Sequence, residues 1–195
     1  MSSGDFLKQV PPPRSSDWLD QDRYTELVQQ RASLHRLPPS SDPALRADAE
    51  AFLFHHARLL DTHDLVGWLD LFANHAIYWV PSDRGTDPRR SVQVVFDDRR
   101  RLEDRIARML SGAAWSETPS NPASHTITNV EAWAEGDRRR VVAKIAVSVL
   151  KPSGTHAFVG LLDDVHVQER GAWRVRNRRV DLIDADRHIV TVPLF

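Results

Sequence analysis

The sequence predicts an α+β domain in which helices come first and a curved antiparallel sheet follows. Between residue 43 and about residue 110 the apolar side chains recur mainly at helical spacing, and after residue 123 they alternate with a period of two. Short turn-like stretches separate the later segments, so consecutive strands should pair antiparallel. In the last predicted strand the apolar residues switch from one face to the other near Asn177. This switch predicts a bulge, and bulges curve sheets. These features indicate a cone with helices packed over its concave face.

Length and composition restrict the possible functions. The chain has 195 residues, 41% of them hydrophobic, which suits one domain with a substantial core. Its 26 Lys and Arg residues nearly balance 27 Asp and Glu residues, which argues against nucleic acid or a membrane surface as a partner. No apolar run is long enough to span a bilayer and no signal peptide is evident, so we expect a cytoplasmic protein.

The absence of cysteine excludes several kinds of site. Without cysteine the chain can form no disulfide, no thiolate metal site and no Rieske cluster, because that cluster needs two Cys and two His ligands. Its nine histidines show no recognised ligand spacing. His55 and His56 are adjacent on a predicted helix, so they diverge by about 100° and cannot share one metal ion. We therefore expect structural histidines rather than a metal site.

Residues 1–42 should form an arm separate from the domain of residues 43–195. Proline-rich stretches bound this arm, and Trp18, Tyr24 and other apolar residues between them suggest a short amphipathic helix. Disordered segments contain few large aromatic side chains. We therefore expect the arm to pack on its own domain or on a neighbour.

Two helices should open the domain. Asp42 before Pro43 is typical of a helix start, and apolar residues at helical spacing follow to residue 60. A second, short helix should follow a cap at Asp61 or Thr62, with apolar residues from Leu65 onward on one face.

A third helix should end at about residue 112. Asp97 or Asp98 can cap its start. The spacing of its charges predicts two intrahelical ion pairs, Asp97 with Arg101 and Asp104 with Arg108.

Six segments read as strands, and the last four should form the antiparallel meander. They lie at residues 76–80, 91–96, 124–133, 141–150, 157–168 and 173–183. Arg138, Arg139 and Arg140 adjoin a predicted hairpin turn, so we expect them to be solvated. A second arginine cluster lies on the last strand, where an exposed sheet face would need carboxylate partners, either within the domain or across an interface.

One group of residues could perform acid–base chemistry. Asp61 and His63 lie where the first helix gives way to the second, and Tyr78 lies on the strand that follows. A His–Asp pair facing the cone would suit proton transfer. Helix capping is the simpler interpretation of the same residues, because such turns are common.

Several segments, taken in order, resemble the small, or β, subunits of aromatic-ring-hydroxylating dioxygenases. The similarity covers roughly residues 44–195, and its segments are 52–61, 68–72, 77–81, 97–108, 158–160 and 173–180. The chain departs from the family at residues 120–125, where the family has Ser-Arg-x-Arg-His. It also departs at Leu161 and Leu162, where the family usually has polar residues.

The resemblance implies a cone-shaped fold of the nuclear-transport-factor-2, or SnoaL-like, type. It also implies a structural subunit without catalytic residues, with no cofactor and no metal of its own. Its partners would be three large α subunits, each with a Rieske iron–sulfur cluster and a mononuclear iron, assembled on a trimer of this chain. The complex would hydroxylate an aromatic ring with dioxygen. The residues implied in folding or subunit contacts are Arg99, Glu103, Arg105, Arg108, Arg176, Arg178 and Arg179.

Two other classes of function remain open at this point. A stand-alone isomerase or dehydratase of the same fold would use Asp61, His63 and Tyr78 as catalytic residues in the cone. A small-ligand binding module would keep the cavity but need no paired acid and base. Both alternatives place an accessible site inside the cone.

Overall fold

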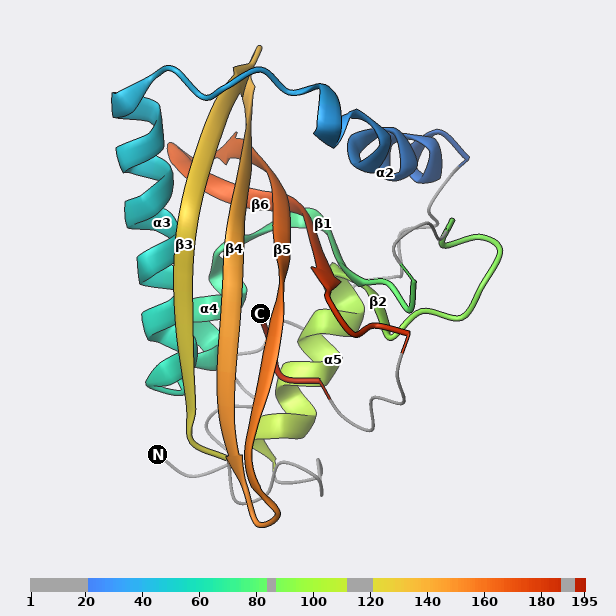
Figure 1. Ribbon diagram of the computed structural model, residues 1–195, viewed down its shortest axis with the longest axis vertical. Helices are drawn as coiled ribbons and strands as arrows, with labels where there is room; N and C mark the ends of the chain where they lie inside the picture. The colour runs from blue at the N-terminus through green and yellow to red at the C-terminus, as the bar shows by residue number, and fades with distance from the viewer. Residues whose placement is uncertain (1–20, 84–86, 112–120, 187–191) are drawn as a thin grey trace.

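The computed structural model describes residues 21–83, 87–111, 121–186 and 192–195. Figure 1 shows one curved sheet with helices on both sides of it. The described helices are α2 (Gln21–Ser33), the 3-10 helix η1 (Leu34–Arg36), α3 (Pro43–Asp61), α4 (Leu65–Asp70) and α5 (Arg99–Leu110). The described strands are β1 (Phe72–Val80), β2 (Val95–Asp98), β3 (Ala123–Glu135), β4 (Arg138–Lys151), β5 (Gly154–Glu169) and β6 (Ala172–Leu182).

The strands form one six-stranded sheet in the order β2-β1-β6-β5-β4-β3. The predicted meander of β3 to β6 is confirmed, since each of these strands pairs antiparallel with the next. The predicted bulge is also present, because Val165 lies opposite Asn177 while His166 lies opposite Val175. Arg176 is thus the extra residue in β6, and the sheet bends there.

β1 pairs with β6 in parallel, which the sequence did not predict. The two strands are separated by about ninety residues along the chain. Sequence patterns report only local geometry, so such a distant partner carries no local signal.

The two faces of the sheet carry different layers. Tyr78 and Val80 in β1 join the main core, which contains residues of α3, α4 and α5. The alternate residues Ile77 and Trp79 join a smaller cluster with Leu27 of α2. Side chains in a strand alternate between faces, so α2 covers the face opposite the main core. The described part of the arm therefore packs on its own domain.

Helix caps agree with the predictions at two of three starts. Asp42 accepts hydrogen bonds from the backbone N–H groups of Ala44 and Leu45, and Asp98 accepts one from Arg101. The prediction for α4 was wrong, because Asp64 caps this helix. The chain makes an extra turn between α3 and α4, with His63 in the left-handed region at φ 58°. That turn moves the cap beyond Asp61 and Thr62.

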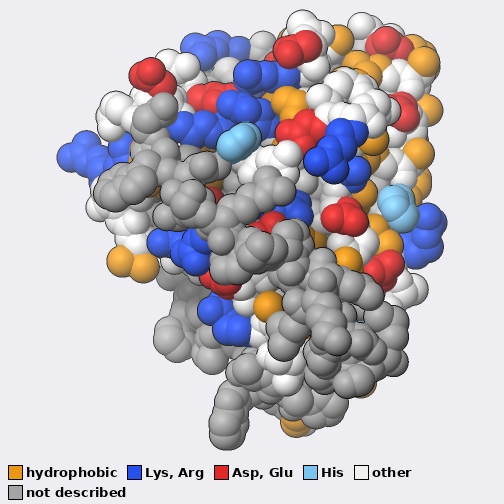
Figure 2. Space-filling view, turned by 180° about the vertical axis from the view of Figure 1, so that it is seen from behind, with side chains coloured by type: hydrophobic (Ala, Val, Ile, Leu, Met, Phe, Trp, Pro, Cys, Tyr) orange, Lys and Arg blue, Asp and Glu red, His pale blue; other side chains and the backbone are white. Residues whose placement is uncertain are grey.

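The ion pairs of α5 also differ from the prediction. Asp97 pairs with Arg105 at 2.6 Å, and Asp104 pairs with Arg100 at 2.9 Å. Asp97 still lies in β2, one residue before the cap, so helical spacing does not govern its contacts. Acidic and basic side chains lie next to one another over the described part of the face shown in Figure 2, in keeping with the near-zero net charge.

Candidate functional site

A buried ion pair lies at the centre of the cone. Asp164 and Arg178 face each other across β5 and β6. The Nε and Nη2 atoms of Arg178 donate to the two carboxylate oxygens of Asp164 at 3.0 and 2.5 Å, and both side chains are fully buried. The guanidinium of Arg178 lowers the pKa of Asp164, against the effect of burial. The aspartate therefore stays ionised.

His166 and Arg139 extend this pair toward the rim of the cone. His166 Nδ1 accepts from Arg139 Nε at 3.0 Å, and His166 Nε2 lies 3.1 Å from Asp164 Oδ2. A carboxylate only accepts, so Nε2 carries the ring proton and the imidazole is neutral. Burial lowers the pKa of His166. Arg139 lies 4.5 Å over the ring of Trp173 and also pairs with Asp48.

His56 extends the network in the other direction. Trp68 Nε1 donates to His56 Nε2 at 2.5 Å, and Arg178 Nη1 contacts the same nitrogen. Both contacts come from donors, so His56 Nε2 accepts and the ring is neutral. Burial, reinforced by the charge of Arg178, holds the pKa of His56 well below its ordinary value. Its other nitrogen, Nδ1, is buried without a hydrogen-bond partner in the described part of the chain.

Phe195 fills the space beside this network. Its side chain is fully buried in the main core, and its ring meets that of Phe158 edge-on at 6.3 Å. The backbone N–H of Phe195 donates to the Tyr78 hydroxyl at 2.9 Å, and its carbonyl oxygen accepts from Arg178 Nη1 at 2.9 Å. Burial raises the pKa of Tyr78 to about 12. Tyr78 is therefore a neutral hydrogen-bonding group that holds Phe195.

Asp61 also holds this end of the chain, through His125. Asp61 Oδ1 lies 2.6 Å from His125 Nδ1 and accepts from the backbone N–H of His125 at 3.0 Å. His125 Nε2 lies 2.9 Å from the carbonyl oxygen of Leu194, so this nitrogen donates. Asp61 thus fixes the ring that binds Leu194.

The predicted acid–base group is therefore not assembled as expected. Asp61 pairs with His125 rather than with His63, and His63 is exposed in the turn after α3. Asp61 and Tyr78 instead hold residues 194 and 195. No local pattern points to His125 as the partner of Asp61, because the two residues are 64 positions apart along the chain.

The two arginine clusters are less exposed than predicted: the side chains of Arg138 and Arg176 are 38% and 26% exposed, and the other members are buried. Arg139 and Arg140 are buried, because the hairpin turn is only two residues long and both already lie within β4. Arg178 and Arg179 are buried too, because helices cover both faces of the sheet around β6. These arginines have carboxylate partners within the chain, as expected: Arg178 pairs with Asp164, and Arg179 pairs with Asp181.

The remaining residues expected in folding or contacts have distinct surroundings. Arg99 donates to Glu103 at 2.9 Å. It also donates to the backbone carbonyl oxygens of Leu69, in the last turn of α4, and of Phe72, at the start of β1. Arg105 pairs with Asp97, whereas Arg108 is exposed in the last turn of α5. In β6, Arg176 lies 3.4 Å from Glu26 and Arg179 lies 2.6 Å from Asp181.

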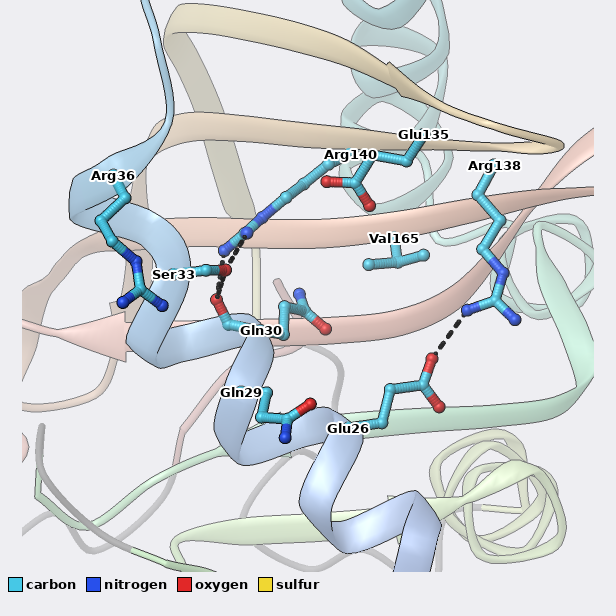
Figure 3. A pocket seen from close by; sticks show the side chains of 9 residues that line it. All are labelled: Glu26, Gln29, Gln30, Ser33, Arg36, Glu135, Arg138, Arg140 and Val165. Atoms are coloured by element: carbon cyan, nitrogen blue, oxygen red, sulfur yellow. Dashed lines mark hydrogen bonds and ion pairs between the residues drawn. The ribbon is translucent and has the colours of Figure 1, made fainter.

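An open pocket of about 500 Å³ lies between α2 and the sheet (Figure 3). Glu26 in this pocket pairs with Arg138 at 2.8 Å, and Ser33 accepts from Arg140 at 2.7 Å. Arg140 also binds Asp163 through two hydrogen bonds. These contacts join α2 to β4 and β5, so the polar lining of the pocket serves mainly to attach the helix.

Among the residues that the structure describes, no group of three or more His, Asp or Glu side chains could hold a metal ion. A Rieske cluster does not fit this chain, because two of its ligands must be cysteines and the sequence has none. None of the described helices is long and apolar enough to cross a membrane.

Comparisons with known proteins agree with this architecture. Residues 55–186 match the family model described as the ring hydroxylating beta subunit. The small oxygenase component of the p-cumate 2,3-dioxygenase system of Pseudomonas putida is 33% identical over 132 residues, which is 64% of this chain and 73% of that protein. The small subunit of the 2-halobenzoate 1,2-dioxygenase of Burkholderia cepacia is 37% identical over 98 residues, which is 47% of this chain but only 59% of that protein.

A solved structure confirms the fold. The β subunit of the benzoate 1,2-dioxygenase of Burkholderia mallei superimposes with a TM-score of 0.62 and 25% identity, covering 74% of this chain and 94% of that chain. The expected cone of the nuclear-transport-factor-2, or SnoaL-like, type is therefore confirmed, with helices packed on a curved sheet. The chain belongs to the β subunits of the aromatic-ring-hydroxylating dioxygenases.

Proposed function

We propose that this chain is a structural subunit that contributes no catalytic residue to its dioxygenase. The observation that carries the proposal is the burial of Phe195, whose side chain packs in the main core beside the Asp164–Arg178 pair. Two of the three candidate residues, Asp61 and Tyr78, are already bonded to His125 and Phe195. An active site would need an accessible acid or base beside a reacting atom.

The proposed partner is a larger α subunit that holds the Rieske cluster and the mononuclear iron. Together they would hydroxylate an aromatic ring with dioxygen, with three α subunits resting on a trimer of this chain in the cytoplasm. The absence of cysteine supports placing the cluster in the partner. The relatives' names, which describe small components of such systems, support the same division of labour.

We further propose two roles for the arginines in the segments that resemble the family. The exposed ones contact neighbouring subunits, and the buried ones stabilise the fold. Arg108 is the clearest candidate for a contact because it is exposed on α5. Arg99, Glu103 and Arg178 are bonded within the chain and belong to the second class.

Co-expression with the cognate large subunit, followed by native mass spectrometry, tests this proposal. We expect a complex of three large and three small chains, and ring hydroxylation only in that complex. Asp61→Asn and His63→Gln variants should support near-normal activity once assembled. Turnover by the purified small chain, or iron bound to it stoichiometrically, would contradict the proposal and favour the isomerase or dehydratase alternative.

A charge reversal tests the contact residue separately. Arg108→Glu should reduce the yield of the complex, whereas Lys144→Glu, a change of another exposed side chain on β4, should leave it near that of the unmodified chain. Equal yields for both variants would show that Arg108 makes no important contact.

A further inference from the structure

We propose that the open pocket between α2 and the sheet binds an acidic amino acid, a ligand with two carboxylates and one ammonium group (Figure 3). This pocket lies under α2, on the face of the sheet opposite the main core, so it is separate from the interior of the cone. The inference goes beyond the proposed function, because the isolated chain has this pocket without an α subunit.

Hydrogen bonds within the chain fix the floor of the pocket. Arg140 donates to the carboxylate of Asp163 and to the hydroxyl of Ser33. Gln30 Nε2 donates to Asp163 at 3.1 Å, and its Oε1 accepts from Asn177 at 3.0 Å. These contacts attach α2 and give the pocket a fixed shape. Because Asp163 balances the charge of Arg140, recognition of a charged ligand depends on the rim.

The rim carries charged side chains that the fold leaves unpaired. Arg36 of η1 and Glu135 at the end of β3 are exposed, and neither side chain has a hydrogen-bond or ion-pair partner among the residues that the structure describes. A guanidinium can bind a carboxylate through two parallel N–H donors, and a carboxylate can bind an ammonium group. One unpaired group of each sign therefore faces a ligand in this pocket.

Arg138 supplies the second cationic group of the rim. It donates to Glu26 at 2.8 Å, but Glu26 is also contacted by Arg23 at 2.5 Å and by Arg176 at 3.4 Å. A further carboxylate, that of Asp137, lies 4.0 Å from Arg138 and is 95% exposed, so its charge is well screened. One carboxylate shared by three guanidiniums leaves a surplus of positive charge at this end of the pocket.

The three rim groups are held apart in an order that matches the ligand. Arg36 and Arg138 lie on opposite sides of the pocket in Figure 3, with Glu135 between them. Glu135 pairs with Arg138 across the hairpin from β3 to β4, and Ser40 binds the backbone of Ala132 and so fixes the linker after η1 to β3. The volume of about 500 Å³ suits a small molecule.

This order assigns the groups of the ligand. The α-carboxylate lies at Arg138 and the ammonium group beside it at Glu135. The side-chain carboxylate lies at Arg36. An acidic amino acid thus complements both the signs and the sequence of the charges on the rim.

Calorimetric titration of the full chain at low ionic strength tests the proposal. We expect L-aspartate or L-glutamate to bind with a Kd on the order of 1 mM, because the contacts lie at a partly exposed rim. The tighter of the two should bind roughly threefold or more tightly than its amide, L-asparagine or L-glutamine, and than the dicarboxylate without the ammonium group, succinate or glutarate. Shifted backbone amide resonances should cluster at residues 26–36 and 135–140.

Two variants separate the contributions of the rim groups. Arg36→Gln should weaken binding of the acidic amino acid and leave binding of its amide unchanged. Glu135→Gln should remove the preference over the dicarboxylate. Arg46→Gln is the matched control, because this arginine is 51% exposed on α3 and lies 3.8 Å from Glu50. It should leave all the affinities unchanged, and circular dichroism should show that all three variants are folded.

Two results would overturn the proposal. One is the absence of both heat and resonance shifts at a ligand concentration on the order of 10 mM, which is well above the expected Kd. The other is an effect of Arg46→Gln as large as that of Arg36→Gln, which would indicate general attraction of anions and not recognition by this pocket.

Discussion

Asp164→Asn should be among the most destabilising single changes in this chain. Asp164 is fully buried and accepts three hydrogen bonds, two from Arg178 and one from His166. A neutral amide of the same size leaves the charge of Arg178 without its counter-ion in the interior. Removing one partner of a buried ion pair costs about 3–5 kcal/mol. Domains are stable by only about 5–15 kcal/mol, so the loss is a large fraction of the total.

Urea unfolding measures this loss. With a slope of about 2–3 kcal/mol per molar for a domain of this size, the midpoint should fall by roughly 1–2 M. Asp137→Asn is the matched control, because that side chain is 95% exposed and lies 4.0 Å from Arg138. Its midpoint should move by less than about 0.3 M, since exposed pairs contribute little.

The comparison of the two variants decides the outcome. If Asp164→Asn shifts the midpoint no more than Asp137→Asn, the buried pair does not stabilise the fold as argued. Combining Asp164→Asn with Arg178→Met should recover part of the loss, because no uncompensated charge then remains. A double variant that is no more stable than Asp164→Asn would assign the loss to another cause.

Three further predictions concern pH, the arm and the sheet. His56 and His166 have lowered pKa values in the folded state. Below about pH 6.5 the unfolded chain therefore binds protons that the folded chain does not. The free energy of unfolding should then fall by up to about 1.4 kcal/mol per pH unit for each histidine. Urea midpoints at pH 6.5 and 5.0 should show a smaller difference in His56→Gln than in the unmodified chain; an identical difference contradicts this. Leu27→Ala should release α2, because Leu27 is 3% exposed against Ile77 and Trp79; hydrogen exchange of α2 amides should rise at least about tenfold, and unchanged exchange would show that other contacts hold the helix. Gly160→Ala should lower the Tm by about 2–10 °C, because a Cβ would lie 2.8 Å from the carbonyl oxygen of Asp181; an unchanged Tm would mean that the strands adjust.

The sequence by itself determined the class of fold and most of its elements. The switch from helical spacing to alternation separated the helices from the meander, and the parity change near Asn177 located the bulge. The cap at Asp42 and the start of α5 were also readable. These features are local, since each depends on residues within a few positions of one another. The absence of cysteine excluded a Rieske cluster directly.

Only the tertiary structure decided which polar side chains are buried and which partners they bind. Arg139 and Arg178 look like surface residues in the sequence, yet both are buried, because α2 and α3 to α5 cover the two faces of the sheet. Asp61 meets His125, and Tyr78 meets Phe195, only once distant segments come together. Burial and pairing depend on contacts between such segments, and no local pattern encodes them. The candidate catalytic residues were therefore recognisable as polar groups near the cone, but their role in holding residues 194 and 195 was not.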